Sequence, residues 1–420
     1  MQPENNAPTV LVVFGVTGDL FAKKIASALS ELFRKQKLPE KFRVVGFSRR
    51  DLNTNIFRKE ITPSVCSPST LGIVKLFSYV QGFFDEQKSY DRLLAELKKI
   101  DAKWGMCSHK LFYLAVPPSL YPLILKNIAS SKLSKTCSEE GRFTRILIEK
   151  PFGSDEKSAE KLDALIKKTF KENQIYRIDH YLAKEMLQNV FNFRVSHGLF
   201  GKEWSDKTVE KIEVRLLEEI GVEDRGAFYD GIGALRDMGQ SHISQMLAVT
   251  TMDKPRNDSA SSYRAARAEV LGKLTPDTKF LFREQYHDYR TIKGVVPNSQ
   301  TETYFKTRAF LKSPQWKGVE IVMESGKKMG EMRKEIVVYL KNGKKLLFQF
   351  EPEEAIFNDG VKLLLKENPE KTAAYQKILS DCIAGDQTLF VSSSEVKNSW
   401  KFTDKIIRAW RAKKIPLVIK

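Results

Sequence analysis

Residues 9–20 read Thr-Val-Leu-Val-Val-Phe-Gly-Val-Thr-Gly-Asp-Leu, and this stretch decides the fold of the first part of the chain. Its first six residues form an apolar run with the length of one buried β-strand. After the glycines, apolar residues at 25, 29, 32 and 33 recur on one helical face. A glycine turn between strand and helix lets the backbone approach a ligand and leaves helix N–H groups free to bind an anion. The stretch therefore predicts a site for the pyrophosphate of a dinucleotide.

The same alternation of strand and helix signals continues to about residue 176. Short apolar runs predict further buried strands at 43–47, 111–116 and 145–149, and helical patterns occupy 121–130 and 156–170. Buried strands that alternate with helices are typical of a parallel sheet covered on both faces. We therefore expect an α/β, Rossmann-type, doubly wound parallel sheet as a dinucleotide-binding domain over residues 1–176.

Residues 177–420 follow a different pattern. Alternating polar and apolar residues predict half-buried strands at 209–219, 304–311, 319–324, 335–340 and 345–350. The last two strands flank Asn342-Gly343, a strong signal for a tight hairpin turn. A helical pattern at 396–410 ends the chain. The pattern predicts an antiparallel, α+β region over residues 177–420.

The composition excludes several classes of protein. The chain has 420 residues, of which 42% are hydrophobic and 29% charged, unlike collagen-like, disordered or coiled-coil proteins. No apolar run reaches the roughly 18–20 residues of a membrane span, and the N-terminus lacks the pattern of a signal peptide. Four widely spaced cysteines (66, 107, 137 and 382) indicate free thiols, without a zinc site or a disulfide relay. We expect a cytoplasmic protein.

The net charge of +18, from 70 basic and 52 acidic side chains, favours an anionic partner without identifying it. Nucleic acid and a phosphorylated metabolite are two such partners, and an excess of lysine that keeps the protein in solution is a third explanation. One local block of seven Lys/Arg and one Asp occupies the last twenty residues, with Trp400 and Trp410 at helical spacing.

The end of the second expected strand bears on the choice of cofactor. Residues 46–50 read Gly-Phe-Ser-Arg-Arg, whereas a loop that binds the 2′-hydroxyl of NAD usually carries Asp or Glu there. Two guanidinium groups suit the 2′-phosphate of NADP, which they bind with bidentate, charge-assisted hydrogen bonds. Unless Arg49 and Arg50 are a solvated surface pair, they predict NADP as the preferred cofactor and NAD as a weaker substitute.

Three further clusters combine acids, bases and hydroxyls. Residues 148–153 (IEKPFG) place Lys150 at a strand end, where open α/β sheets bind ligands. Residues 236–242 (RDMGQSH) end in His242 and lie at an expected helix start. Residues 177–185 (RIDHYLAKE) pack an acid, two phosphate donors and a hydroxyl into six positions, namely Asp179, His180, Tyr181 and Lys184. A single histidine is more often structural, but histidines among such partners indicate an active site.

Together these motifs make the chain resemble the glucose-6-phosphate dehydrogenase family. The matching segments occur in the family's order and cover most of the chain: GVTGDL, GFSRR, FYLAVPPSLY, ILIEKPFG, RIDHYLAKE, RGAFYDGIGALRDMGQSH, MDKP and GDQTLF. The resemblance implies an oxidoreductase that transfers hydride from C1 of D-glucose 6-phosphate to NADP and forms 6-phosphoglucono-1,5-lactone, the first step of the oxidative pentose phosphate pathway. It also implies that residues 177–420 form an α+β, substrate-binding and dimerisation domain with a large antiparallel sheet, on which a homodimer is built. It implies no metal and no nucleic-acid or membrane partner.

The resemblance assigns roles to residues by position. His242 matches the general base that takes the C1 hydroxyl proton, and Asp179 matches the carboxylate that orients this base. The positions that match cofactor-binding residues are Gly15, Thr17, Gly18, Asp19, Leu20, Arg49, Tyr121 and Lys150. The positions that match substrate-binding residues are Lys150, His180, Tyr181, Lys184, Glu218, Asp237 and Lys327.

The chain also departs from the family pattern. Ala183 replaces a glycine, Phe21 replaces a small residue and would crowd the glycine turn, and Met332 replaces a basic residue beside Arg333. The stretch 350–375 is shorter than usual, which predicts lost strands and puts the homodimer in question. Two alternatives stay open. One is a related sugar-phosphate dehydrogenase with altered substrate or cofactor choice. The other is a catalytically idle nucleotide-binding regulator or nucleic-acid binder.

Overall fold

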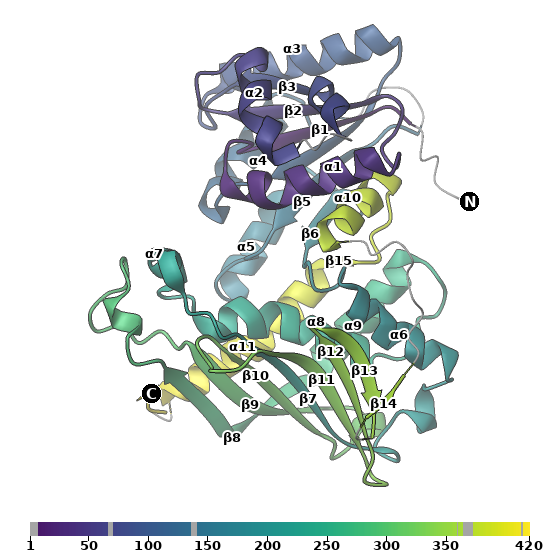
Figure 1. The fold of residues 1–420 in the computed structure, drawn as a ribbon, viewed down its shortest axis with the longest axis vertical. Helices are drawn as coiled ribbons and strands as arrows, with labels where there is room; N and C mark the ends of the chain where they lie inside the picture. The colour runs from purple at the N-terminus through teal and green to yellow at the C-terminus, as the bar shows by residue number, and fades with distance from the viewer. Residues whose placement is uncertain (1–6, 66–69, 136–140, 359, 364–372, 413–414) are drawn as a thin grey trace. The chain divides into compact units, whose positions relative to one another are not determined.

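The computed structural model describes residues 7–420 except 66–69, 136–140, 359, 364–372 and 413–414, and the chain forms two compact units (Figure 1). The first unit comprises residues 1–152, 160–183 and 372–391, and the second comprises 153–159, 184–371 and 392–420. This division differs from the expected boundary after residue 176, because a strand of the first sheet ends at Ile178 and a late segment of the chain returns to that sheet.

The first unit contains a seven-stranded sheet in the order β15-β6-β5-β4-β1-β2-β3. All neighbours are parallel apart from the edge pair of β15 and β6. The order β3-β2-β1-β4-β5-β6 is that of a Rossmann sheet, so the expected doubly wound architecture is confirmed. The strands are β1 (Thr9–Phe14), β2 (Phe42–Ser48), β3 (Phe77–Gln81), β4 (His109–Leu114), β5 (Thr144–Glu149), β6 (Ile175–Ile178) and β15 (Phe390–Val391).

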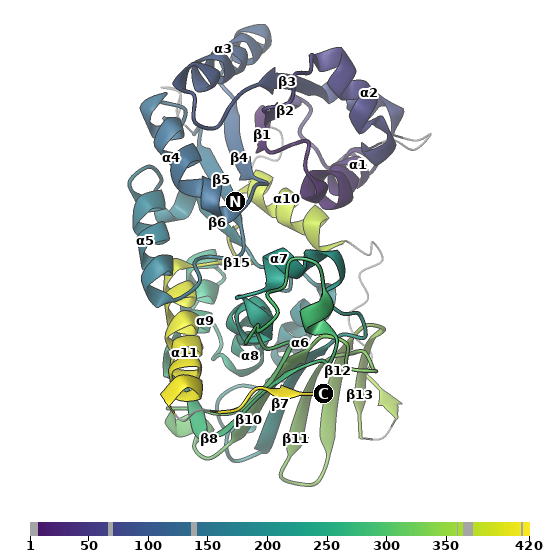
Figure 2. The same ribbon diagram turned by 90° about the vertical axis from the view of Figure 1, so that its left-hand side faces the viewer.

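Helices cover both faces of this sheet. Figure 2 shows α1, α2 and α10 on one side of it and α3 and α4 on the other. A strand covered on both faces must be apolar throughout, and β1 is buried at all six of its positions. The helices are η1 (Phe21–Ile25), α1 (Ala26–Arg34), α2 (Thr54–Val65), α3 (Gln87–Trp104), α4 (Tyr121–Ser130), α5 (Glu156–Lys167) and α10 (Ala374–Ala384).

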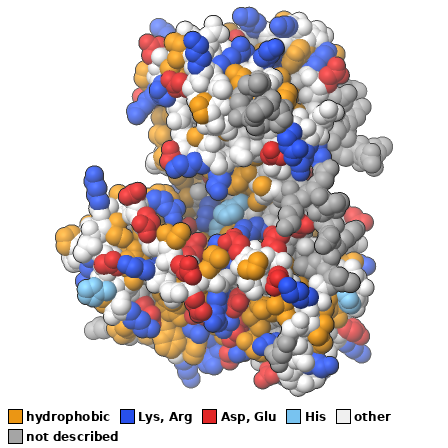
Figure 3. Space-filling view, in the orientation of Figure 1, with side chains coloured by type: hydrophobic (Ala, Val, Ile, Leu, Met, Phe, Trp, Pro, Cys, Tyr) orange, Lys and Arg blue, Asp and Glu red, His pale blue; other side chains and the backbone are white. Residues whose placement is uncertain are grey.

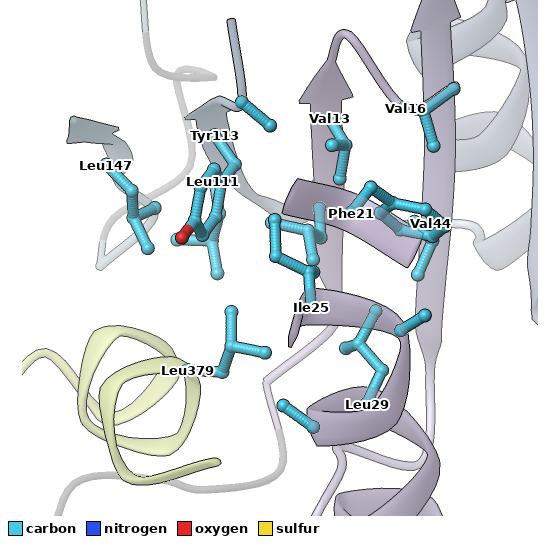
Figure 4. Packing of buried hydrophobic residues seen from close by; sticks show 14 of the residues in the cluster. Val13, Val16, Phe21, Ile25, Leu29, Val44, Leu111, Tyr113, Leu147 and Leu379 are labelled. Atoms are coloured by element: carbon cyan, nitrogen blue, oxygen red, sulfur yellow. The ribbon is translucent and has the colours of Figure 1, made fainter. Parts of the chain in front are cut away.

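The core beside the glycine turn accommodates Phe21. Its side chain is 1% exposed, and its ring makes an edge contact with Phe77 at 6.1 Å between centroids. Figure 4 shows Phe21 and Ile25 pointing toward the strands, and Leu379 of α10 belongs to the same cluster. The expected crowding of the turn is therefore wrong, because this side chain lies in the core, where burial of a phenylalanine contributes about 1.5–3 kcal/mol.

The cysteines depart from the expectation in one place. Cys382 on α10 is free, and burial raises the pKa of its thiol to about 12. Cys107 is disulfide-bonded, so the expectation of free thiols is wrong at this position. Cys66 and Cys137 lie outside the described residues.

The second unit contains a nine-stranded sheet in the order β14-β13-β12-β11-β7-β10-β9-β8-β16. Two neighbouring pairs, β7 with β10 and β8 with β16, are parallel, so the large expected sheet is mixed and not wholly antiparallel. The alternation of polar and apolar residues reports the two faces of a strand and carries no information on its direction. The strands are β7 (Val209–Leu217), β8 (Leu274–Gln285), β9 (Tyr304–Leu311), β10 (Glu320–Gly326), β11 (Arg333–Leu340), β12 (Lys345–Phe350), β13 (Glu353–Phe357), β14 (Val361–Lys362) and β16 (Val418–Ile419).

The expected hairpin at Asn342-Gly343 is confirmed. Strands β11 and β12 pair in antiparallel register with Tyr339 opposite Lys345, and Gly343 has a φ of 81°, which the tight turn requires. Part of the stretch 350–375 follows as β13 and β14, while residues 359 and 364–372 of it lie outside the described residues.

Helices cover one face of the second sheet (Figure 1). Alternate residues of β7 such as Ile212 and Val214 are fully buried, whereas Glu213 between them bonds to charged and hydroxyl groups of its own and a neighbouring strand. Helix α11 buries both Trp400 and Trp410. Among the described residues, no helix combines the length and apolarity needed to cross a bilayer. The helices are α6 (Glu185–Ser196), α7 (Gly226–Tyr229), η7 (Leu235–Ile243), α8 (Ser244–Thr251), α9 (Ala260–Lys273) and α11 (Ser393–Ala412).

Candidate active site

The glycine loop after β1 forms a backbone cradle in the first unit. Gly15 has a φ of 80°, and a Cβ at this position would lie 2.6 Å from the carbonyl oxygen of Ala115. The Gly18 N–H donates to the Gly15 carbonyl at 2.9 Å, and the Thr17 hydroxyl bonds to that of Ser48 at 2.8 Å. Only glycine fits the first position, so the loop keeps its backbone open to a pyrophosphate group, as a dinucleotide requires.

The two arginines after β2 differ in their surroundings. Arg50 is exposed and pairs with Glu60 at 2.9 Å. Arg49 is also exposed, and no ion-pair partner for it occurs among the described residues. Asp19 in the glycine loop pairs with Lys23 at 2.9 Å in open solvent, and Leu20 is half-buried. Of these two guanidinium groups, only that of Arg50 is therefore held by a carboxylate of the described residues.

Three tyrosines form hydrogen bonds with Glu149 at the end of β5, two with its carboxyl group and one with its backbone carbonyl. The hydroxyls of Tyr113 and Tyr375 donate to Glu149 Oε1 at 2.6 and 3.2 Å, and the Tyr121 hydroxyl donates to the Glu149 carbonyl at 3.2 Å. Burial raises the pKa of Glu149 to about 7, although hydrogen bonds from Tyr113 and Tyr375 and the charge of Lys150 oppose that rise. Tyr121 itself is fully buried, and its hydroxyl lies at the strand end that precedes Lys150, while its contact with a cofactor stays a prediction.

Neighbouring strand ends bring Lys150 and Asp179 to the same edge of the first sheet. Strands β5 and β6 are parallel, with Glu149 opposite Ile178, and the two site residues follow directly. Asp179 is 2% exposed, and its Oδ1 accepts the Tyr181 N–H at 3.0 Å. Lys150 and His180 are half-buried. The carboxyl edge of this sheet therefore collects the glycine loop, Arg49, Lys150 and the segment 179–181.

His180 and Tyr181 lie against a tyrosine from the far end of the sequence. The rings of His180 and Tyr181 are 5.1 Å apart, and the His180 ring stacks on Tyr375 of α10 at 6.3 Å. Tyr375 thus contacts both the histidine and Glu149. Sequence reasoning missed Tyr375 and Glu149, although Glu149 follows a buried apolar run, which is itself a signal.

In the second unit, one helix carries both Asp237 and His242. The expected helix start at 236–242 is instead the π-helix η7, which continues directly into α8, so His242 lies well inside a helix. His242 is 1% exposed, whereas Asp237 is half-buried. A Cβ at Gly239 would lie 2.7 Å from the Phe305 ring, so this glycine allows the helix to pack closely on β9. π-helical segments occur often at functional sites.

The ends of β7 and β10 hold a second pair of site residues. Lys327, which follows β10, is 6% exposed and forms an ion pair with the carboxylate of Glu218, which follows β7. Their backbones are fixed as well, because the Glu218 N–H donates to the Gly326 carbonyl and the Lys327 N–H to the Thr303 carbonyl, both at 2.9 Å. The parallel pairing of β7 with β10 brings these two residues together.

Lys184 lies in a separate ion-pair group of the second unit. Its Nζ is 2.8 Å from Glu351 Oε1, and Lys334 binds the other oxygen of the same carboxylate. Burial raises the pKa of Glu351, but hydrogen bonds from the two lysines outweigh it and hold that pKa below its usual range. Nothing in the sequence points to Glu351, which is 167 positions from Lys184. The departure at Met332 leaves this side chain exposed, and Arg333 beside it pairs with Glu331.

Comparison with known proteins identifies one family over both units. Residues 12–189 match the model for the glucose-6-phosphate dehydrogenase NAD binding domain, and residues 191–372 and 360–418 match that for the C-terminal domain. The glucose-6-phosphate 1-dehydrogenase of Bacillus subtilis is 31% identical over 466 aligned positions, covering 99% of this chain and 94% of that protein. The enzyme of Aggregatibacter actinomycetemcomitans is 33% identical over 446 positions, covering 94% and 90%.

A solved structure agrees with these relatives. It is described as glucose-6-phosphate dehydrogenase in complex with its substrate glucose-6-phosphate, and it matches 100% of this chain and 95% of its own, with a TM-score of 0.90 and 26% identity. Because both units match the family models and the relatives align along almost their whole length, the chain belongs to the glucose-6-phosphate dehydrogenase family.

Proposed function

We propose that this chain oxidises C1 of D-glucose 6-phosphate to 6-phosphoglucono-1,5-lactone with NADP as hydride acceptor, the first step of the oxidative pentose phosphate pathway. The observation that carries the proposal is the whole-chain match to a dehydrogenase solved with glucose 6-phosphate. Every residue type that the reaction needs is present at the positions named from the sequence.

The reaction removes two hydrogens from one carbon–oxygen group. When bound, NADP supplies the nicotinamide carbon that accepts the C1 hydrogen with its electron pair. The C1 hydroxyl proton must leave at the same time, and an imidazole can take it at neutral pH, so His242 is proposed as the general base. Asp179 is proposed to orient that imidazole and to stabilise the imidazolium that forms. The C1–O1 group then becomes the lactone carbonyl.

The substrate-binding residues are assigned by the positions that match the family. His180, Tyr181 and Lys184 are proposed to bind the phosphate, which would take the place of Glu351 beside Lys184. Glu218 and Asp237 are proposed to accept hydrogen bonds from sugar hydroxyls, with Lys327 and Lys150 as donors. Each of these lysines is half-buried or buried, which strengthens a charge-assisted hydrogen bond over that of a lysine in open water.

The preference for NADP rests on the loop after β2. Of the two arginines in this loop, Arg50 pairs with Glu60, whereas Arg49 is exposed and has no ion pair with another described residue, so a 2′-phosphate would supply one. The glycine loop supports the pyrophosphate site, because Gly15 leaves a cradle that a Cβ would fill. A cytoplasmic location and a homodimer stay predictions.

Two observations give no support to the alternative of a nucleic-acid binder. Both tryptophans near the basic C-terminal block are buried in α11, so neither ring is free to stack on a base. Figure 3 shows Lys and Arg mixed with Asp and Glu on the visible face of each unit, without one basic patch. The other alternative is a related sugar-phosphate dehydrogenase, and the experiment below distinguishes it from a glucose-6-phosphate dehydrogenase.

The test measures absorbance of the reduced nicotinamide at a fixed protein concentration. Glucose 6-phosphate, glucose and other hexose phosphates are each supplied with NADP and then with NAD. The proposal expects the largest kcat/KM for glucose 6-phosphate with NADP, and a much smaller value for glucose. A larger kcat/KM for another sugar phosphate would identify that compound as the substrate instead. No reduction of either cofactor with any of the sugars would refute the enzyme activity.

A further inference from the structure

A buried carboxylate lies at the start of the helix that carries Asp237 and His242. Glu302, in the connection between β8 and β9, is 4% exposed. Its Oε1 accepts the N–H of Leu235 at 3.1 Å, and its backbone carbonyl accepts the N–H of Ala234 at 3.0 Å. The first N–H groups of a helix lack partners within the helix. Glu302 therefore accepts hydrogen bonds from the first N–H of η7, at Leu235, and from the N–H of the preceding residue, Ala234.

The chain leaves a specific space for this carboxylate. Gly233, just before η7, has a φ of 80°, and a Cβ added there would collide with both Glu302 carboxylate oxygens. One further bond ties the same segments together, because the Gly231 N–H donates to the Thr301 hydroxyl at 2.7 Å. A left-handed glycine and a buried carboxylate that fit each other in this way hold the helix start in one position.

The segment that holds the helix also holds the neighbouring site residues. Thr303, the next residue, accepts the Lys327 N–H at 2.9 Å, and Lys327 pairs with Glu218. Thr303 is itself fixed to the end of β8, because its N–H donates to the Glu284 carbonyl and its hydroxyl accepts the Tyr286 N–H. Residues 301–303 are thus a common anchor for the helix of His242 and for the Glu218–Lys327 pair.

The charges around Glu302 come from three elements. Burial raises the pKa of Glu302 to about 7, while Arg236 on η7 and Arg283 on β8 lower it. The third neighbour is Tyr229 on α7, whose own pKa is raised by burial and by the carboxylates of Asp237 and Glu302. Glu302 therefore passes between its neutral and its charged form near pH 7, and in both forms its Oε1 can accept the N–H of Leu235.

We infer that Glu302 is a positioning residue for the dehydrogenase reaction: through the start of η7 it sets the place of His242 relative to the Glu218–Lys327 pair. The inference rests on the proposed function, in which His242 is the base. A shift of about 1 Å in a reacting group can cost a large factor in rate, so an anchor outside the site has a measurable effect on turnover.

Three variants test the role of the side chain. Glu302→Ala removes the hydrogen-bond acceptor, and Glu302→Gln keeps an Oε1 acceptor without the charge. The control, Glu213→Gln, neutralises another buried carboxylate of the same unit, on the sheet face away from the helices. We expect Glu302→Ala to lower kcat at least about tenfold, and Glu302→Gln to stay within about threefold of the wild type. Glu213→Gln is expected to keep the wild-type kcat.

Two further readouts separate positioning from loss of folded protein. Turnover of glucose 6-phosphate deuterated at C1 should slow more in Glu302→Ala than in the wild type, because a misplaced base makes the hydride step limiting, whereas a smaller folded fraction leaves the isotope effect unchanged. Amide hydrogen exchange of residues 235–243 should accelerate in Glu302→Ala and not in Glu213→Gln.

The outcomes are distinguishable. Wild-type kcat in Glu302→Ala, an unchanged isotope effect, or equal losses in the Ala and Gln variants would each overturn the inference and leave the proposed function standing. A wild-type protein that does not oxidise glucose 6-phosphate would overturn the proposed function, and catalytic positioning by Glu302 with it.

Discussion

His242 is 1% exposed and lies inside a helix, so an asparagine there fits with little rearrangement. If it is the general base, His242→Asn should lower kcat by roughly 10²–10⁴-fold, the usual contribution of such a group. The Michaelis constants should change little, because the phosphate and the cofactor are bound by other residues. The acid limb of the kcat–pH profile should also disappear. A variant with wild-type turnover or an unchanged acid limb would point to another base.

The two arginines after β2 provide a matched pair of variants. Arg49→Ala should raise the KM for NADP by about 10–100-fold and leave that for NAD nearly unchanged, because only NADP carries a 2′-phosphate. Arg50→Ala should have a smaller effect, since Arg50 pairs with Glu60. Initial rates with both cofactors check this. Equal losses with NADP and NAD in Arg49→Ala would contradict the assignment.

Glu351 competes with any anion that binds Lys184. Its carboxylate is shared by Lys184 and Lys334, so Glu351→Gln should free positive charge and lower the KM for glucose 6-phosphate about two- to tenfold. The control is Glu354→Gln, which removes an exposed pair with Lys362 and should leave the KM unchanged. A raised KM in Glu351→Gln would show that the carboxylate orients Lys184 for the phosphate.

At the scale of elements, the packing of η7 on β9 depends on Gly239. A Cβ there would lie 2.7 Å from Phe305 and 3.0 Å from Leu235, so Gly239→Ala should destabilise the second unit by about 1–3 kcal/mol through overpacking. Gly272→Ala on α9 is the control, because its nearest neighbour is the end of the Asn398 side chain, and alanine favours a helix. Thermal unfolding of both variants measures the difference. A Gly239→Ala protein as stable as the control would contradict this packing.

The elements that sequence reasoning found are those whose signal is local. The run 9–14 is apolar at nearly every position and became β1, and the Asn342-Gly343 turn became the hairpin of β11 and β12. Strands β15 and β16 have two residues each, too few for any periodicity, and only pairing with β6 and β8 defines them. The sequence also carries no local signal for the parallel direction of β10 beside β7.

The residues of the candidate site also fall into those with a local signal in the sequence and those without one. Residues inside recognisable motifs, such as Gly15 and His242, could be proposed from the sequence because the motif around each of them is local, and their roles stay predictions. Glu302, Glu351 and Tyr375 could not, because each acts on a residue far away in the sequence, and contact between distant segments is fixed only by the folded chain.

At the scale of the whole molecule, two buried carboxyls link stability to pH. The pKa values of Glu149 in the first unit and Glu302 in the second rise from 4.5 to about 7 on burial. Between these values the folded state binds more protons than the unfolded state, so stability falls as pH rises from about 4.5 to 7 and stays low above it. Each group accounts for roughly 3 kcal/mol at most.

Glu302→Gln should remove the pH dependence of stability that the titration of Glu302 gives to the second unit. Its free energy of unfolding should fall less than that of the wild type between pH 5 and pH 8, and the two proteins should differ most at pH 8. Denaturant unfolding followed at both pH values measures this. Parallel curves for the two proteins would show that Glu302 does not titrate in this range.

The return of residues 372–391 to the first sheet has a consequence for synthesis. Strand β6 gains its edge partner β15, and Leu379 joins the core, only after about 200 further residues have been translated. At ~5–20 residues per second the ribosome needs roughly 10–40 s for that distance. During this interval the nascent first unit carries an unpaired strand edge and an uncovered apolar surface, which are features that chaperones bind and that promote aggregation. A chain terminated before α10 would keep that exposed edge permanently.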